Sequence, residues 1–144
     1  MTAKRTALIT GGTGCLGRAI AVALHDAGHD VIVTYHSSEN ATREWIKEEA
    51  AKGRTFAMYK VNVADFDACQ TLARKLEEDG RQIDILVNNA GITRDTTFHR
   101  MRADQWHDVI NTNLNSVFNV TRPVIEGMRR RGWGRVIQIS SING

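Results

Sequence analysis

The segment Leu8–Leu24, LITGGTGCLGRAIAVAL, passes from a β-branched apolar run through a cluster of glycines into an amphipathic helical pattern. Residues Gly12–Gly17, GTGCLG, fit the pattern G-x-G-x-x-G between a first strand and a first helix. Free N–H groups and the positive end of a helix suit a dinucleotide pyrophosphate, and the last glycine permits close packing of helix on strand. The segment therefore predicts a dinucleotide-binding turn, and a glycine-rich turn of purely structural origin is the alternative.

Short β-branched runs alternate with longer helical patterns along the rest of the chain, which is typical of βαβ units. The predicted strands lie near Thr6–Thr10, Val31–Tyr35, Thr55–Val61, Ile83–Val87 and Arg135–Ser140, and the predicted helices near Leu16–Ala27, Ala41–Lys52, Phe66–Glu78 and Ala103–Met128. Strands that are apolar on both faces suit a parallel sheet with helices on each side. Right-handed crossovers then favour an α/β fold, a Rossmann-type doubly wound parallel sheet with strand order 3-2-1-4-5.

Composition is consistent with one globular domain over residues 1–144, since 42% of the 144 residues are hydrophobic and no linker or repeat interrupts them. The net charge of +3 is spread along the chain except at Arg129–Arg131, which we interpret as a solvated helix end and not a nucleic-acid patch. No stretch has the length of a signal sequence or a membrane span, and Cys15 and Cys69 have no metal-type spacing. We expect a cytoplasmic protein with no metal and no nucleic-acid or membrane partner.

Four motifs in order along the chain carry a family resemblance. The segment TGGTGCLG, from Thr10, also reads as T-G-x-x-x-[G/A]-x-G apart from Cys15 at the sixth position; NNAG follows at Asn88, NTNLNSVFNV at Asn111, and GRVIQISSING ends the chain. Together they resemble the short-chain dehydrogenase/reductase family over all 144 residues. Within that family, NNAGITRD and RGWGRVIQISSING look most like acetoacetyl-CoA reductases, with 3-oxoacyl-acyl-carrier-protein reductases as near relatives. The resemblance implies reduction of a 3-oxoacyl thioester of CoA or acyl carrier protein, by a homo-oligomer, a tetramer, when complete.

The resemblance also implies residue roles. Ser141 would hydrogen-bond the substrate carbonyl oxygen, and Asn113 would interrupt the helix bonding and hold a water of the proton relay. The implied cofactor contacts are Gly11, Gly12, Thr13, Leu16, Gly17, Tyr35, His36, Ser37, Asn62, Val63, Asn89, Ala90 and Gly91. For Asn113 the alternative is a solvent-facing helix residue, and for Ser141 a strand terminator. Asn89 is expected to brace the central strands and the cofactor without entering the chemistry.

The residues about 20 positions after the glycines distinguish NAD from NADP, because an NAD-binding protein has a carboxylate there that accepts from the ribose 2′-hydroxyl. The end of the second predicted strand instead offers Tyr35, His36 and Ser37, which carry hydroxyls and an imidazole. Nothing there repels a 2′-phosphate, so the segment favours NADP(H). Ser37 and Ser38 could alternatively serve only as helix caps. On the adenine side, Asn62 stands where the family usually has Asp.

Cys15 departs from the family pattern, which has Gly or Ala at that position. We expect a small apolar side chain that packs inward; the alternative is a redox-sensitive thiolate at a helix N-terminus.

The family's proton donor, the Tyr of a Tyr-x-x-x-Lys pair, has no counterpart among the 144 residues. We therefore expect an N-terminal portion of a longer reductase, inactive alone, whose uncovered fifth strand leaves an exposed apolar edge. The alternative class is a non-catalytic NADP(H)-binding module. The choice between CoA and acyl carrier protein, and the stereochemistry, depend on downstream loops.

Overall fold

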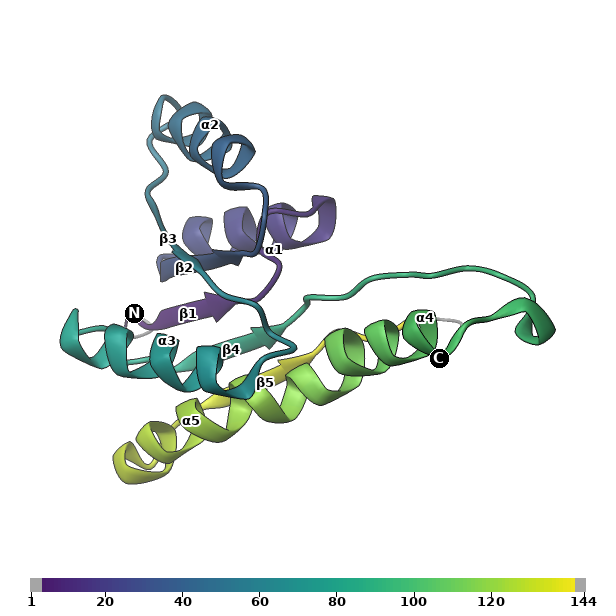
Figure 1. Ribbon diagram of the computed structural model, residues 1–144. Coiled ribbons are helices and arrows are strands. Elements are labelled where there is room, and N and C mark those ends of the chain that lie inside the picture. The colour runs from purple at the N-terminus through teal and green to yellow at the C-terminus, as the bar shows by residue number, and fades with distance from the viewer. Residues whose placement is uncertain (1–3, 142–144) are drawn as a thin grey trace.

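A computed structural model describes residues 4–141 of the chain. Its five strands form one parallel sheet in the order β3-β2-β1-β4-β5, with helices on both faces, so the predicted fold class and strand order are confirmed (Figure 1). The strands are β1 Thr6–Ile9, β2 Asp30–Tyr35, β3 Phe56–Lys60, β4 Ile85–Asn88 and β5 Arg135–Gln138. Because all strands run in one direction, the segments that follow them meet at the carboxyl edge of the sheet, where α/β proteins bind ligands.

The helices are α1 Cys15–Asp26, α2 Glu39–Ala50, α3 Phe66–Glu78, α4 Ala103–Val109 and α5 Ser116–Arg131, with a short 3₁₀ turn η1 Phe98–Arg100 and a π-helical segment η2 Ile110–Asn115. The single helix predicted over Ala103–Met128 is therefore wrong in one respect: η2 interrupts it between α4 and α5. An apolar pattern of period 3.6 does not reveal one widened turn, so this interruption was not visible in the periodicity.

Two apolar clusters hold the layers together, one on each face of the sheet. Alternate residues of β1 point to opposite faces, so Leu8 packs toward α3 and α5 whereas Ile9 packs toward α1 and α2. Both side chains are fully buried. On the α3 side the helices contribute Leu72, Leu76, Val120, Val124 and Met128, and on the α1 side Ala21 and Trp45.

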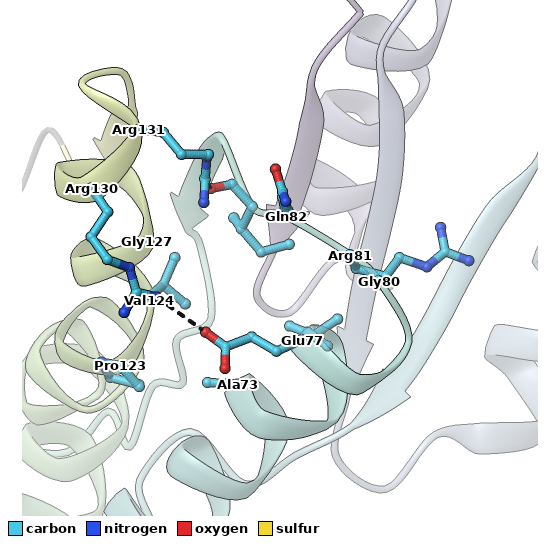
Figure 2. A pocket seen from close by; sticks show the side chains of 12 residues that line it. Ala73, Glu77, Gly80, Arg81, Gln82, Pro123, Val124, Gly127, Arg130 and Arg131 are labelled. Carbon is cyan, nitrogen blue, oxygen red and sulfur yellow. Dashed lines mark hydrogen bonds and ion pairs between the residues drawn. The ribbon is translucent and has the colours of Figure 1, made fainter.

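The arginines at the end of α5 differ in environment. Arg129 and Arg130 are exposed, as expected for a solvated helix end, but Arg131 donates to the Ile83 carbonyl and lies 3.3 Å from the Asp84 carboxylate. Figure 2 shows Arg130 reaching Glu77 across a cleft of about 360 Å³ between α3 and α5. Arg131 is exposed like the other two, as the interpretation of a solvated helix end expects, but its guanidinium also contacts the segment that leads into β4.

The edge strand β5 leaves apolar side chains in contact with solvent, since Ile137 is 43% exposed and Ile139 just after the strand is 38% exposed. This matches the exposed apolar edge that we expected. Across residues 4–141, no helix is long and apolar enough to cross a membrane, and no group of three or more His, Cys, Asp or Glu could hold a metal ion.

The difference in burial between two leucines predicts different losses of stability when each is replaced by alanine. Leu76 of α3 is 1% exposed and Leu114 of η2 is 62% exposed. Leu76→Ala should lower the free energy of unfolding by about 2–5 kcal/mol, because it leaves a cavity in the core. Leu114→Ala, the matched control, should change it by less than about 0.5 kcal/mol. Urea titration followed by circular dichroism measures both, and equal losses would contradict the assignment of the core.

Candidate functional site

The glycine-rich turn after β1 allows backbone to lie against backbone. Gly11 has φ +60, and a Cβ there would lie 2.9 Å from the Ala90 Cα. A Cβ on Gly12 would lie 2.7 Å from Val33, and one on Gly17 would lie 2.7 Å from the Gly12 Cα. Any residue larger than glycine is therefore excluded at these three positions by close contacts, and α1 begins directly after the turn.

The first turn of α1 carries no side-chain cap, since the N-cap Gly14 supplies none. The intrahelical ladder begins with the Arg18 N–H on the Gly14 carbonyl at 2.9 Å, and the first N–H groups of a helix have no intrahelical acceptor. The Arg18 guanidinium also donates to the Thr13 carbonyl at 2.8 Å and lies over the Trp45 ring. Arg18 thus stabilises the turn, a role that the glycine pattern did not predict.

Thr10 joins the turn to the NNAG segment. Its hydroxyl oxygen accepts from the N–H groups of Asn89 and Ala90 at 3.0 and 3.1 Å. The Asn89 side-chain amide donates in return to the carbonyls of Thr10 and Gly11, both at 3.1 Å. Asn89 therefore braces the ends of β1 and β4 against each other, and Thr10 is a positioning residue that sequence reasoning missed although it opens the T-G motif.

A groove of about 410 Å³ lies at this carboxyl edge. Seven of the predicted cofactor residues line it: Gly11, Tyr35, His36, Asn62, Val63, Ala90 and Gly91. The other six predicted residues are outside its lining: Gly12, Thr13, Leu16, Gly17, Ser37 and Asn89. Of these, Gly12, Gly17 and Asn89 shape the turn beside the groove, whereas Leu16 is 54% exposed and Ser37 is exposed.

Five polar residues of the groove were not predicted: Thr34, Arg94, Asp108, Asn111 and Thr112. Arg94 comes from the loop after β4 and its Nε lies 3.5 Å from the Asp108 carboxylate of α4. This pair joins two segments whose proximity depends on the path of the loop. The sequence signal was limited to the presence of Arg94 within NNAGITRD.

The loop after β3 is held by α5, which packs on the same face of the sheet as α3. The side-chain amide of Asn119 in α5 donates to the Val63 carbonyl at 3.0 Å. The side-chain oxygen of Asn62, Oδ1, accepts from the Ala64 N–H at 3.1 Å. Beneath them Cys69 is buried, and this burial raises its pKa to about 11, so the thiol stays protonated at neutral pH. Asn62 therefore closes a local turn at the groove, a use that Asp would also permit.

Asn113 lies in the π-helical segment η2 and is tied to the loop after β4. Its side-chain oxygen accepts from the Ile92 N–H at 2.8 Å, and its side-chain nitrogen donates to the Ile92 carbonyl at 2.9 Å. Asn113 is exposed, as the alternative of a solvent-facing helix residue expects, and its amide nevertheless makes two hydrogen bonds to the main chain of the loop. The two bonds fix the loop that carries Gly91 against the helix, so Asn113 positions one wall of the groove.

Ser141 lies three residues beyond β5 and is exposed. β5 pairs with β4 in parallel register, with Gln138 beside Asn88, and the Ile139 N–H donates to the Asn88 carbonyl at 3.0 Å. The chain therefore leaves the sheet at the same edge as the NNAG segment, and Ser141 lies on the side of the sheet edge that carries the groove.

Cys15 is exposed, so the expectation that it packs inward is wrong. The buried residues of α1 are Gly17 and Ala21, which lie four positions apart on one face. A residue two positions before Gly17 is rotated by about 200° from that face, so the thiol points away from the sheet.

This parallel sheet, with a glycine-rich turn after β1 and a groove at its carboxyl edge, has the features of a dinucleotide-binding domain. The model of the short chain dehydrogenase family matches residues 5–144, and the chain belongs to that family. The family resemblance predicted from the motifs is therefore confirmed.

Among curated relatives, acetoacetyl-CoA reductase of Shinella zoogloeoides is 47% identical over 141 residues, which cover 98% of this chain and 56% of that protein. The acetoacetyl-CoA reductase of Paracoccus denitrificans is also 47% identical, over 140 residues. The 3-oxoacyl-[acyl-carrier-protein] reductase of Staphylococcus aureus is 38% identical and matches the whole of this chain and 58% of its own. The chain thus spans a little over half the length of these relatives.

A solved structure with the same fold is gluconate 5-dehydrogenase from Burkholderia cenocepacia in complex with NADP and tartrate. It matches with a TM-score of 0.87 and 32% sequence identity, over 95% of this chain and 53% of that one.

The packing of the turn predicts unequal effects of alanine at two glycines. A Cβ on Gly17 meets the backbone of the turn, whereas a Cβ on Gly14 meets only the Gly11 carbonyl at 3.6 Å, an ordinary contact. Gly17→Ala should lower the free energy of unfolding by roughly 1–3 kcal/mol through overpacking. Gly14→Ala should leave it within about 0.5 kcal/mol. Denaturant titrations without any nucleotide measure both, and a stable Gly17→Ala variant would show that the turn is looser than described.

Proposed function

We propose that this protein takes part in the NADPH-dependent reduction of a 3-oxoacyl thioester, acetoacetyl-CoA, to the 3-hydroxyacyl thioester. The observation that carries the proposal is the groove at the carboxyl edge, which adjoins the glycine-rich turn and is walled by the loop that Asn113 fixes. The substrate is suggested by the acetoacetyl-CoA reductases, which are 43–49% identical to this chain.

The residues of the site fit a dinucleotide. The open N–H groups at the start of α1 suit a pyrophosphate, and the turn excludes the side chains that would obstruct its approach. NADPH supplies a hydride when bound. Thr10 and Asn89 keep the turn and the NNAG segment in register on either side of the groove.

At the substrate end, Ser141 donates a hydrogen bond to the carbonyl oxygen, where negative charge develops during reduction. Asn113 holds the loop after β4, and in this proposal a water of the proton relay binds at the π-helical segment around it. The general acid for the alkoxide lies outside these 144 residues in this proposal, because they contain no Tyr-x-x-x-Lys pair.

The proposal includes a cytoplasmic, homotetrameric protein with a single dinucleotide-binding domain, as the family resemblance implies. An acyl-carrier-protein thioester is the second candidate substrate, supported by the relative from Staphylococcus aureus. A non-catalytic module that only binds NADP(H) is the alternative class.

NADPH should bind at least about tenfold more tightly than NADH, a difference of about 1.4 kcal/mol. The reason is that the strand end offers Tyr35, His36 and Ser37 and no carboxylate to repel a 2′-phosphate. Titration of the tryptophan fluorescence with each nucleotide measures the two dissociation constants. Equal or reversed affinities would contradict the assignment of NADP(H).

Residues 1–144 alone should show no measurable oxidation of NADPH with acetoacetyl-CoA, since a positioned general acid contributes about 10²- to 10⁴-fold. A protein of the relatives' length that contains these residues should turn over. In that protein Ser141→Ala should lower kcat far more than it weakens NADPH binding, whereas Ser140→Ala, the matched control, should keep kcat. Turnover by the 144 residues, or an undiminished kcat in Ser141→Ala, would show that these roles are assigned to the wrong residues.

A further inference from the structure

The Arg18 side chain of α1 folds back onto the turn from which its own helix begins. Its Nε donates to the Thr13 carbonyl at 2.8 Å, five residues earlier in the chain. The N–H of the same peptide unit belongs to Gly14 and donates to the Gly11 carbonyl at 3.2 Å. Because a peptide unit is planar, these two hydrogen bonds fix the orientation of the peptide between Thr13 and Gly14 from both ends.

The residue that follows this peptide cannot hold it by packing. Gly14 is exposed, and a Cβ there would meet only the Gly11 carbonyl, at 3.6 Å. Glycine also adopts more combinations of φ and ψ than any other residue, so Gly14 does not restrict the chain by its own conformation. Arg18 therefore supplies a side-chain contact at a place where Gly14 supplies none.

The guanidinium of Arg18 is held on its other side by α2. Its Cζ lies 5.3 Å from the centroid of the Trp45 ring, within the range of a cation–π contact. Trp45 is 5% exposed, and its ring stacks on Phe56 at the start of β3 with the centroids 4.9 Å apart and the planes at 10°. Helices α1 and α2 cover the same face of the sheet (Figure 1). Arg18 thus lies between a buried aromatic pair and the turn.

The peptide that Arg18 fixes leads directly into the open N–H groups of α1. The N–H groups of Cys15, Leu16 and Gly17 precede the first intrahelical hydrogen bond, which runs from the Arg18 N–H to the Gly14 carbonyl, and they have no intrahelical acceptor. Their direction depends on how the chain enters the helix. A rotation of the peptide before Gly14 would change the direction in which these donors face the groove.

We propose that Arg18 is a positioning residue for the pyrophosphate of the nucleotide. Through the Thr13 carbonyl it holds the turn in the orientation in which the first N–H groups of α1 face the ligand, and Trp45 keeps the guanidinium in place. Arg18 acts on the main chain of the turn and does not itself contact the ligand. This inference rests on the proposed dinucleotide site and adds to it a residue that organises the site before binding.

Two substitutions separate the hydrogen bond of Arg18 from its charge. In Arg18→Gln the side-chain nitrogen is as many bonds from Cα as Nε is in arginine, so it can donate to the Thr13 carbonyl without a positive charge. Arg18→Met has a similar length and no donor. Arg, Gln and Met have similar helix propensities, so the comparison leaves the stability of α1 nearly constant. Arg18 is only partly buried, so both variants should fold, and thermal melts check this.

Isothermal titration calorimetry of the purified protein and its variants measures the binding of NADPH. Arg18→Met should weaken NADPH binding roughly tenfold, the order expected when a hydrogen bond from a charged donor is lost. Arg18→Gln should keep most of the affinity of the wild-type protein. Adenosine 2′-monophosphate lacks the pyrophosphate, so its affinity, measured by competition with NADPH, should be the same for the wild-type protein and both variants.

Arg74→Met is the matched control for the loss of one arginine. Arg74 is exposed on α3, at the opposite face of the sheet from α1, and its Nη2 donates to the Thr71 hydroxyl at 3.0 Å. The control should bind NADPH as the wild-type protein does.

The other outcomes would overturn the inference. Equal weakening by Arg18→Gln and Arg18→Met would show that Arg18 acts through its charge, and unchanged NADPH binding in both would show that the main chain alone holds the turn. Weaker binding of adenosine 2′-monophosphate by Arg18→Met would show that the effect is not confined to the turn. In these three cases the proposed function would stand. A wild-type protein that binds neither NADPH nor NADH would overturn the proposed function and this inference together.

Discussion

The close approach of α1 to the turn after β1 is the constraint on which the rest of the site depends. At Gly17 and Gly12 a single added carbon would meet backbone or the Val33 side chain, so the helix can begin where it does only without those side chains. That starting point directs the open N–H groups of α1 toward the carboxyl edge of the sheet. The groove follows from the same geometry, since Gly11 and Ala90 form adjoining parts of its wall.

Side-chain amides then connect loops that belong to different strands. Asn89 joins the turn to the segment after β4, Asn113 joins that segment to η2, and Asn119 joins α5 to the loop after β3. An amide both donates and accepts, so it can satisfy main-chain groups that a loop leaves without strand partners. Three irregular loops are in this way held around one groove, which is what a bound cofactor of extended shape requires.

Ion pairs between charged side chains have a smaller and more local role in this structure than the glycine packing and the amide hydrogen bonds. Many charged side chains form short-range pairs, such as Arg94 with Asp108 at the groove and Arg43 with Glu39 at the start of α2. Exposed pairs of this kind add little to stability.

The sequence by itself determined the sheet order, the two-faced core and the position of the glycine-rich turn, because apolar periodicity and glycine spacing are local signals. It also pointed to seven residues that line the groove. The family resemblance implied that Asn113 interrupts the helix bonding, but the apolar periodicity did not show the π-helical segment there. The sequence also did not reveal the exposure of Cys15 or the contact of Arg131 with the chain before β4. The pairings of Arg94 with Asp108 and of Arg43 with Glu39 likewise appeared only in the structure. Each of these depends on distances between separate elements or on the direction of a side chain within a turn, and the tertiary structure alone decides such quantities.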